Sequence, residues 1–319
     1  MHVKGLFAFD LEVCKVEREC GWEQGGVHGD GRYHLLAKGT GLHDKSWHYD
    51  YLKLLLGTGL ITSSVEKWRP RRKLLAPCFH TDILRGFLTI FNERSQTLVE
   101  YLRLETKKEF TNIGTPVTLT TLDIIYEAML GSSVEALENN SAQYITAMKK
   151  LLNINMSRVL KFWEWSTFIH DLTSGREEKR VVKLINDVTK SVIQERKKQY
   201  LNGHKNVRGK RKALMDLLLE LHFETKELSE EDICEEVNTF VAAGHETVAH
   251  TITWALYLVG LYPDVQAKIH EELDGIFGTD GNRYVTETDL NDLKYLECVL
   301  KSPRPLQVNS SSTDGMESL

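Results

Sequence analysis

The stretch FVAAGHETVAH, residues 240–250, lies at the centre of a long apolar segment whose spacing is typical of one buried helix. A glycine inside a helix costs about 1 kcal/mol relative to alanine. A buried glutamate is also costly unless it is paired or protonated. The sequence places both Gly244 and Glu246 in the middle of this segment. Because departures from local rules tend to mark functional sites, we expect this stretch to carry chemistry.

The helix that contains this stretch has clear signals at both ends. Ser229 precedes three acidic residues, Glu230, Glu231 and Asp232, which suit the positive end of the helix dipole. The apolar pattern runs to about Tyr262, and the next residue is a proline, which is favoured at the start of a further helix. At ~1.5 Å per residue the predicted helix spans on the order of 50 Å, which is long enough to cross a domain.

Composition limits the class of protein. The 319 residues are 41% hydrophobic and 27% charged, which is ordinary for a soluble globular protein. The net charge of −5 argues against a protein built mainly to bind nucleic acid. The five cysteines are scattered and odd in number, which argues against a disulfide framework and a structural zinc site. Since no run approaches the ~20 apolar residues of a membrane span, we expect no transmembrane anchor in this chain.

Helical signals dominate from Asp44 to Lys301 and strand signals are few, so we expect a mainly α fold. Residues 1–43 are rich in Gly, His and charge, and we expect them to be poorly ordered. Residues 302–319 are polar, aperiodic and contain proline, which predicts a disordered tail. Apolar spacing predicts amphipathic helices over three further ranges, 81–104, 141–160 and 176–200.

A zinc site is one explanation for the central stretch, because His245, Glu246 and His250 nearly spell the H-E-x-x-H motif of zinc proteases. That motif needs histidines four residues apart on one helix face. Here they are five apart, so the second points about 140° away from the first. Ala249 occupies the position that a ligand would need. We therefore expect no metal site formed by protein ligands here.

A groove for a flat ligand is the second explanation. Ala243 and Gly244 would let a bulky, flat molecule approach the backbone closely. Thr247 can donate a hydrogen bond to the carbonyl of Ala243, which would loosen that turn. Glu246 beside Thr247 could then relay protons into an apolar pocket. The plainer alternative stays open: Glu246 faces solvent and Gly244 serves helix packing.

Residues 243–248, AGHETV, resemble the oxygen-binding helix signature of the cytochrome P450 haem-thiolate monooxygenases, [A/G]-G-x-[D/E]-T-[T/S], with Val248 at the last position. WRPRR, residues 68–72, resembles the family's W-x-x-x-R element, and its spacing puts Trp68 and Arg72 on one helix face. Further segments, which follow one another in the same order as in the family, also resemble it. Their sequences are most similar to family four, the fatty-acid ω-hydroxylases and their relatives. These segments are 57–63, 254–278 and 290–301, so that the resemblance covers about residues 44–301.

The resemblance implies a partial cytochrome P450 fold, a helical core with the long oxygen-binding helix. It implies a haem (heme) cofactor and the insertion of one oxygen atom from O2 into a small apolar substrate such as a fatty acid. It also implies electrons from NADPH-cytochrome P450 reductase and a place at the cytoplasmic face of the endoplasmic reticulum membrane.

The resemblance also implies roles for single residues. Glu246 and Thr247 would handle protons and dioxygen, while Ala243 and Gly244 would flank the haem. The same resemblance gives the W-x-x-x-R element, Trp68 and Arg72, contact with a haem propionate, for which arginine is suited. The basic surface expected to meet an acidic redox partner comprises Arg69, Arg71 and Lys73.

Several positions depart from the family pattern. Ala243 stands where many members of family four carry a glutamate that bonds covalently to haem, so we expect no such link. Pro70 lies within the W-x-x-x-R element and removes one backbone hydrogen bond. We expect Trp68 and Arg72 to keep their geometry if Pro70 falls in the first turn of its helix.

The largest departures concern the iron. The family holds it by a cysteine thiolate in an F-x-x-G-x-R-x-C-x-G loop, and no cysteine of this sequence lies in that context. An E-x-x-R pair should begin just after Lys301, where the sequence reads SPRP instead. We therefore expect a chain truncated at both ends, with weak or no haem binding and no turnover. The alternative function is a non-catalytic helical fragment or isoform that binds partners.

Overall fold

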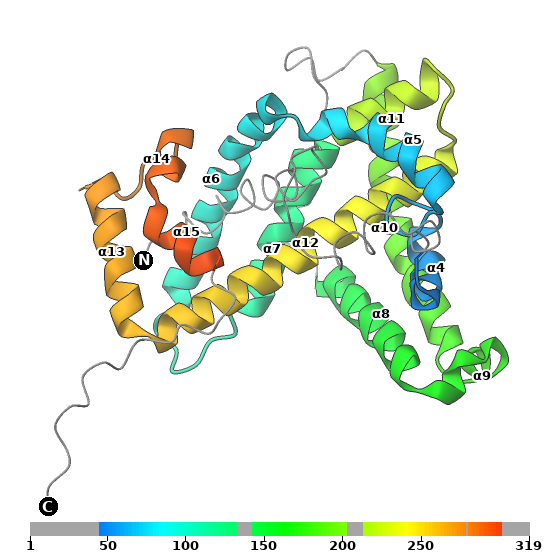
Figure 1. Cartoon of the computed structure of the whole chain (residues 1–319), viewed down its shortest axis with the longest axis horizontal. Helices are drawn as coiled ribbons and strands as arrows, with labels where there is room; N and C mark the ends of the chain where they lie inside the picture. The colour runs from blue at the N-terminus through cyan, green and yellow to red at the C-terminus, as the bar shows by residue number, and fades with distance from the viewer. Residues whose placement is uncertain (1–44, 133–141, 203–212, 279, 302–319) are drawn as a thin grey trace, which may run out of the picture.

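The computed structural model describes residues 45–132, 142–202, 213–278 and 280–301. Every regular element within these ranges is a helix, which confirms the predicted mainly α fold (Figure 1). The expectations of a poorly ordered start, 1–43, and a disordered tail, 302–319, fall outside the described residues.

The helices of the first half of the chain precede a much longer one. They are η1 (Trp47–Leu52), α4 (Lys53–Leu56), α5 (Val65–Leu75), η2 (Ala76–Phe79), α6 (Thr81–Glu105), α7 (Gly114–Ile125), the π-helical turn η3 (Tyr126–Leu130) and α8 (Ala142–Leu160). Those that follow are η4 (Phe162–Trp165), α9 (Thr167–Leu172), α10 (Gly175–Leu201), α11 (Leu214–Phe223), α12 (Glu230–Leu261), α13 (Pro263–Phe277), α14 (Glu287–Asp292) and α15 (Lys294–Lys301). The three predicted amphipathic helices correspond to α6, α8 and α10.

Helix α12 begins and ends where the sequence predicts, within one residue. The hydroxyl of Ser229 accepts the N–H of Asp232 at 3.1 Å, and the Asp232 carboxylate accepts the N–H of Ser229 at 3.0 Å. This reciprocal capping box satisfies two of the donors that a helix start leaves unpaired. At the other end α12 stops at Leu261 and Pro263 begins α13.

The main hydrophobic core lies on both sides of α12, which crosses the molecule in Figure 1. Helix α7 packs along it and is buried on nearly every side, from Pro116 to Ile124. Helix α7 therefore lies inside the protein, although several of its buried side chains are polar. The core residues that these two helices contribute include Leu122, Ile124, Val237, Val241 and Ile252.

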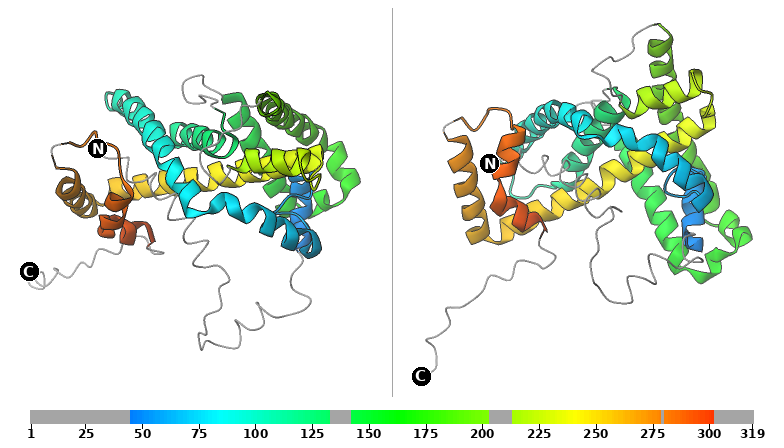
Figure 2. Two further views of the ribbon diagram at one scale, coloured as in Figure 1. Left: turned by 90° about the horizontal axis from the view of Figure 1, so that it is seen from above. Right: turned by 45° about the horizontal axis from the view of Figure 1, so that its top comes forward.

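A second, smaller core joins α13, α14 and α15 beside the C-terminal half of α12 (Figures 1 and 2). Two contacts attach this unit to α6. The amide of Asn92 donates to the carbonyl of Val285 at 3.0 Å and accepts its N–H at 2.8 Å. Arg85 binds the carboxylate of Glu287 through two nitrogens, at 2.7 and 3.2 Å. The C-terminal helices are therefore fixed to α6 by polar groups, while apolar side chains such as Val259 attach them to α12.

No single helix in the described ranges combines the length and the apolar character of a membrane span. Only the pair Val65–Phe79 and Thr81–Glu105, bent by 57°, meets both conditions when taken together.

Candidate functional site

The central stretch is part of one continuous α-helix. The hydroxyl of Thr247 donates to the carbonyl oxygen of Ala243 at 2.7 Å, which confirms the predicted hydrogen bond. The turn keeps its helical form throughout, so the loosening that we expected from this bond is absent. Thr247 itself is exposed.

Gly244 makes a close approach, but to another helix. A Cβ atom added there would lie 2.5 Å from Cδ1 of Ile125 and 3.0 Å from its Cγ1. The space that a side chain would occupy is therefore filled by α7. This is the plainer of the two roles weighed for Gly244, helix packing, and its place beside a haem stays a prediction.

The packing at Gly244 gives a first testable prediction. In Gly244→Ala the methyl group meets only the flexible end of Ile125, and alanine favours the helix by about 1 kcal/mol, so we expect a change in unfolding free energy within about 1 kcal/mol. Gly244→Val adds branches that the site cannot accept and should cost about 1–3 kcal/mol. Urea unfolding measures both.

The double variant Gly244→Val with Ile125→Ala is the matched control, since it reopens the space. It should be more stable than the sum of the two single effects predicts. If the effects of the two substitutions on the unfolding free energy are strictly additive, Ile125 is not the residue that prevents a larger side chain at position 244.

Glu246 and Thr247 do not form a pair. The Glu246 side chain is only 12% exposed, so the alternative in which it faces solvent is wrong. Its Oε2 is buried, has no hydrogen-bond partner among the described residues, and lies 3.5 Å from Nε2 of His245. Its Oε1 lies 3.6 Å from Nδ1 of His250. The neighbours of this carboxylate are thus two imidazoles rather than the hydroxyl of Thr247.

The two histidines lie in different surroundings. His245 is fully buried, and its Nδ1 lies 2.5 Å from the carbonyl oxygen of Val241. Burial lowers the pKa of His245. His250 is 62% exposed, so the two rings diverge as their spacing predicts. Among the described residues no three histidines, cysteines or carboxylates gather in a way that could hold a metal ion.

Trp68 and Arg72 lie side by side on α5. The guanidinium carbon of Arg72 is 5.4 Å from the centre of the Trp68 ring, which confirms the predicted shared face. Pro70 is the sixth residue of α5, beyond its first turn, and the helix continues through it. The condition that we placed on Pro70 is therefore not met, yet the pair keeps its geometry.

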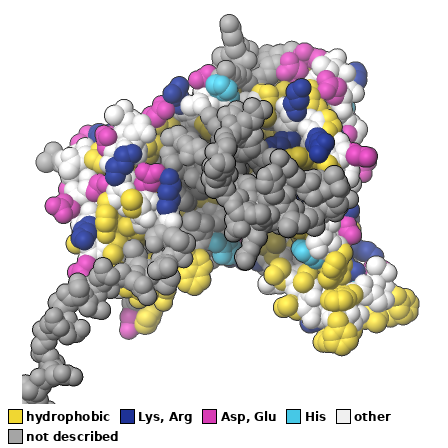
Figure 3. All heavy atoms as spheres, viewed as in Figure 1, with side chains coloured by type: hydrophobic (Ala, Val, Ile, Leu, Met, Phe, Trp, Pro, Cys, Tyr) yellow, Lys and Arg dark blue, Asp and Glu magenta, His cyan; other side chains and the backbone are white. Residues whose placement is uncertain are grey.

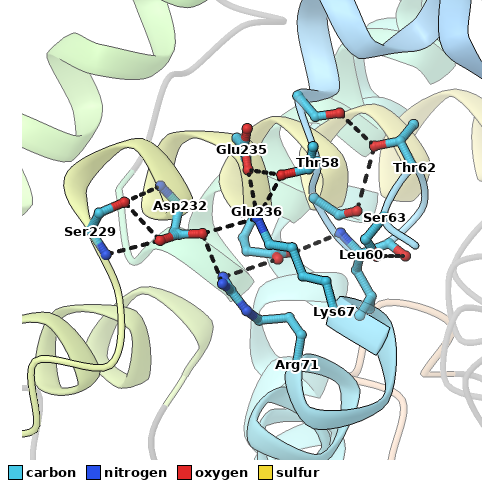
Figure 4. A network of polar contacts seen from close by, with 12 residues as sticks. Thr58, Leu60, Thr62, Ser63, Lys67, Arg71, Ser229, Asp232, Glu235 and Glu236 are labelled. Carbon is cyan, nitrogen blue, oxygen red and sulfur yellow. Dashed lines mark hydrogen bonds and ion pairs between the residues drawn. The ribbon is translucent and has the colours of Figure 1, made fainter. Parts of the chain in front are cut away.

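Arg71 is not part of an exposed basic surface, and that expectation was wrong. Its side chain is buried against α12, where Nη2 lies 2.8 Å from Oδ1 of Asp232 and Nη1 lies 3.3 Å from Oε1 of Glu236 (Figure 4). Adjacent helix residues point about 100° apart, so one residue of a basic run can be buried between exposed neighbours. The neighbours Arg69 and Lys73 are exposed, as expected.

The ion pairs of Arg71 belong to a larger network that sequence reasoning missed. Lys67 Nζ lies 3.3 Å from Glu235 Oε2 and donates to the hydroxyl of Thr58 at 2.6 Å. The buried carboxylate of Glu236 accepts the N–H of Leu60 at 3.2 Å. Figure 4 shows these side chains converging from α5 and from the segment before it onto the start of α12. The acidic first turns of α12 and the basic run of α5 were the sequence signals for this network.

Two acids in the network have displaced pKa values in opposite directions. Burial alone would raise the pKa of Asp232, but hydrogen bonds from Ser229 and Arg71 outweigh it and hold that pKa well below its usual range. Burial raises the pKa of Glu236, although the Leu60 N–H and Arg71 oppose it. Arg71 therefore helps to keep the Asp232 carboxylate charged, although burial alone would favour its neutral form.

The network fixes α5 to the helix that carries residues 243–247. The rings of Phe79 and Phe240 stack with centres 5.6 Å apart and tie η2 to α12 as well. Phe240 lies about one turn before Ala243 on the same face of the helix. The polar network and the stacked rings therefore fix the position of α5, which carries Trp68 and Arg72, relative to the central stretch of α12.

The cysteines with displaced pKa values do not suit an iron thiolate. Cys78 lies in the main core, where burial, with a smaller contribution from Asp216, raises the pKa of its thiol to about 12. Burial also raises the pKa of Cys234. A metal ligand must be the thiolate, so burial of this kind opposes ligation. Arg72, by contrast, is exposed beside Trp68, and its guanidinium has the chemistry to bind a carboxylate such as a haem propionate.

The chain belongs to the cytochrome P450 family, whose model matches residues 33–301. The relatives to which it is similar are cytochromes P450 of family four. It is 40% identical over 269 residues to mouse cytochrome P450 4V2, covering 81% of this chain and 51% of that protein. It is 39% identical over 274 residues to Drosophila melanogaster cytochrome P450 4c3, with 81% and 51% covered. The chain thus spans about half the length of these curated relatives.

Proposed function

We propose that the chain provides part of a haem-dependent monooxygenase of an apolar substrate such as a fatty acid, and that the 319 residues alone are inactive. Electrons would come from NADPH-cytochrome P450 reductase, at the cytoplasmic face of the endoplasmic reticulum membrane. The observation that carries the proposal is the helix signature at residues 243–248 within a chain of this family, with Thr247 bonded to the carbonyl of Ala243. Bound haem would supply the activation of dioxygen.

The residues of this chain would bind, position and move protons. We assign the haem propionate to Arg72, held beside Trp68, and the flanks of the haem to Ala243 and Gly244. Thr247 would offer its oxygen as an acceptor, since its proton is already donated along the helix. Glu246 has a buried oxygen without a partner in the described part of the chain, which suits a group that exchanges protons.

The remaining assignments concern the ends of the chain and its redox partner. We propose that residues 44–301 form the P450-like helical region and that 302–319 is a non-matching tail; the non-matching start that we expected over 1–43 is shortened, because the family model begins at residue 33. The exposed Arg69 and Lys73 on α5 would meet acidic groups of the reductase. Arg71 has no part in that contact, because its charge is directed to α12.

We further propose that the 319-residue chain by itself does not form a haem-thiolate centre. The purified chain, mixed with haem, reduced and exposed to CO, should lack the absorption band typical of thiolate ligation. Mouse cytochrome P450 4V2 treated in the same way is the positive control. A stoichiometric thiolate-type band from the 319-residue chain would refute this part of the proposal.

A partner-binding role without catalysis is the second candidate function. Its support is an exposed apolar surface at the tip formed by α8, η4 and α9, where hydrophobic side chains gather in Figure 3. Contiguous apolar surface of this kind marks interaction sites in soluble proteins. A complete lack of haem binding, by any spectrum, would favour this candidate. The exposed side chains at the tip include Phe162, Trp163, Trp165, Phe168 and Leu172.

A further inference from the structure

The acid of the central stretch is buried although its neighbours on α12 are open to solvent. Thr247 and His250 are exposed, whereas the Glu246 side chain is only 12% exposed. Its Oε2 is buried without a hydrogen-bond partner among the described residues. Burial of an unpaired carboxylate is costly, and a glutamate side chain has ample rotamer freedom to turn toward water. A specific contact is therefore needed to hold this carboxyl inside the protein.

The imidazole of His245 presents one unpaired nitrogen to this carboxyl. Its Nδ1 lies 2.5 Å from the carbonyl oxygen of Val241, which can only accept, so Nδ1 carries a proton. Its Nε2 is buried, has no hydrogen-bond partner in the described part of the chain, and lies 3.5 Å from Oε2 of Glu246. Two buried polar atoms that lack a hydrogen bond thus lie next to each other.

The neighbouring helices fix His245 more firmly than Glu246. The hydroxyl of Thr121 on α7 donates to the carbonyl oxygen of His245 at 3.1 Å. The ring of Tyr144 on α8 lies beside the imidazole, with the two ring centres 6.5 Å apart. His245 is fully buried, so its ring has little room to turn in a close-packed interior. The imidazole is therefore the fixed member of the pair, and the carboxyl is the member that can move.

A single proton between the two atoms satisfies both of them. With Nδ1 protonated, a neutral ring has a lone pair at Nε2, and a carboxylate oxygen also offers only lone pairs. One proton placed between Nε2 and Oε2 makes a hydrogen bond possible, and a small rotation of the Glu246 side chain brings the two atoms to bonding distance. The geometry thus favours a pair of His245 and Glu246 that retains one proton.

The outer imidazole does not explain why the carboxyl is buried. Nδ1 of His250 lies 2.8 Å from the backbone carbonyl oxygen of Glu246 and 3.6 Å from its Oε1, so its proton is directed to the backbone. The His250 side chain is 62% exposed. Contacts between exposed polar side chains contribute little to stability, because water competes for both partners. The contact that confines Glu246 is therefore the one with His245.

We propose that His245 is a positioning residue, which holds the Glu246 carboxyl inside the protein through one proton shared between Nε2 and Oε2. The inference rests on the proposed function, in which Glu246 exchanges protons, and it names the group that fixes where this exchange takes place. Without the imidazole the carboxyl turns outward, toward His250 and solvent. His245 acts only through Glu246.

Carbodiimide-driven labelling of carboxyl groups measures the exposure of Glu246 in the 319-residue chain without haem. Tandem mass spectrometry of the peptides gives one rate for each carboxyl. Glu231, exposed on the same helix, supplies the fast reference rate, and Glu236, which is 1% exposed, supplies the rate of a buried carboxyl. We expect Glu246 to react about fivefold more slowly than Glu231, because a hydrogen bond of ordinary net strength holds it inside. Equal rates for Glu246 and Glu231 would contradict the proposal.

Two substitutions of His245 separate positioning from packing. In His245→Asn the amide takes the place of Nδ1 but is too short to reach the acid, so labelling of Glu246 should rise about fivefold. In His245→Gln the longer amide donates to the carboxylate, so the rate should stay near that of the wild type. Glu236 should remain slow in both variants, which shows that the fold is kept. An unchanged Glu246 rate in a folded His245→Asn variant would overturn the proposal, as would fast labelling in His245→Gln.

His250→Ala is the matched control on the outer side of Glu246. It removes an exposed imidazole, so the labelling rate of Glu246 should change by no more than about twofold. A larger effect of this substitution than of His245→Asn would assign the positioning role to the outer ring and overturn the proposal.

A variant of the acid decides the question if His245→Asn unfolds, which fast labelling of Glu236 would reveal. Glu246→Ala leaves the buried ring in place and removes only the neighbour of its Nε2. In 15N spectra of histidine side chains the Nε2 resonance of His245 should move, while that of Nδ1 stays. An unmoved Nε2 resonance would overturn the proposal. None of these measurements needs haem, so a failure of the chain to take part in haem binding would contradict the proposed function alone.

Discussion

Replacement of Arg71 by alanine should lower the free energy of unfolding by about 3–5 kcal/mol at pH 7. The change would leave the Glu236 carboxylate, which is 1% exposed, without its cation. It would also remove a cation that holds down the pKa of Asp232. A buried charge without a partner is among the few single-site mechanisms that give losses of this size.

Arg72→Ala is the matched control, since it removes the same side chain one residue further along the same helix. Arg72 is exposed and its ring contact with Trp68 is worth about 0.5–1 kcal/mol, so the loss should stay near that value. Urea unfolding followed by far-UV circular dichroism measures both variants. Similar losses in the two would show that the contacts of Arg71 with α12 do not hold the helices together.

The penalty in Arg71→Ala should also depend on pH. Burial already raises the pKa of Glu236, and loss of the cation raises it further. A group whose pKa is raised on folding contributes stability below its unfolded value, and this contribution is lost as pH rises through the folded value. The difference between wild type and variant should therefore be smaller near pH 5 than at pH 7. An equal difference at both would mean that Glu236 does not change its charge in this range.

Leu122→Ala should be the second large effect, with a loss of about 2–5 kcal/mol. Leu122 lies on α7, is 1% exposed, and belongs to the core between α7 and α12. Removal of its side chain leaves a cavity that two packed helices can close only in part. The spread in the expected value reflects how far the surrounding side chains relax.

Leu104→Ala makes the same chemical change on α6 at a side chain that is 69% exposed. Surface substitutions of this kind stay within about 0.5 kcal/mol. The midpoint of urea unfolding should therefore shift for Leu122→Ala and hardly move for Leu104→Ala. Two equal midpoints would contradict the close packing of α7 on α12.

Much of the fold follows from local sequence signals. Ser229 and Pro263 mark the ends of α12 because capping chemistry and the missing N–H of proline act within one or two turns of the chain. The spacing of His245 and His250 separates their side chains for the same reason. The stretch AGHETV, together with its companions in family order, is also sufficient to indicate the cytochrome P450 family.

The surroundings of the individual side chains depend on tertiary packing. Within KWRPRRK every cation looks alike in the sequence, yet the structure buries Arg71 and leaves Arg72 exposed. Likewise it directs Glu246 toward His245 rather than Thr247. A step of one residue turns a side chain by about 100° around the helix, so its surroundings depend on which face the neighbouring helix covers.

The sequence by itself therefore determined which segments are helices and where α12 begins and ends, because caps, prolines and apolar periods act locally. It also determined the family of the protein, through short motifs that follow one another in the family's order. Only the tertiary structure decided that Gly244 meets Ile125, that Arg71 neutralises the acids at the start of α12, and that Thr121 of α7 bonds to His245. These contacts connect residues brought together by helix packing, and their partners are set by the burial of whole helix faces.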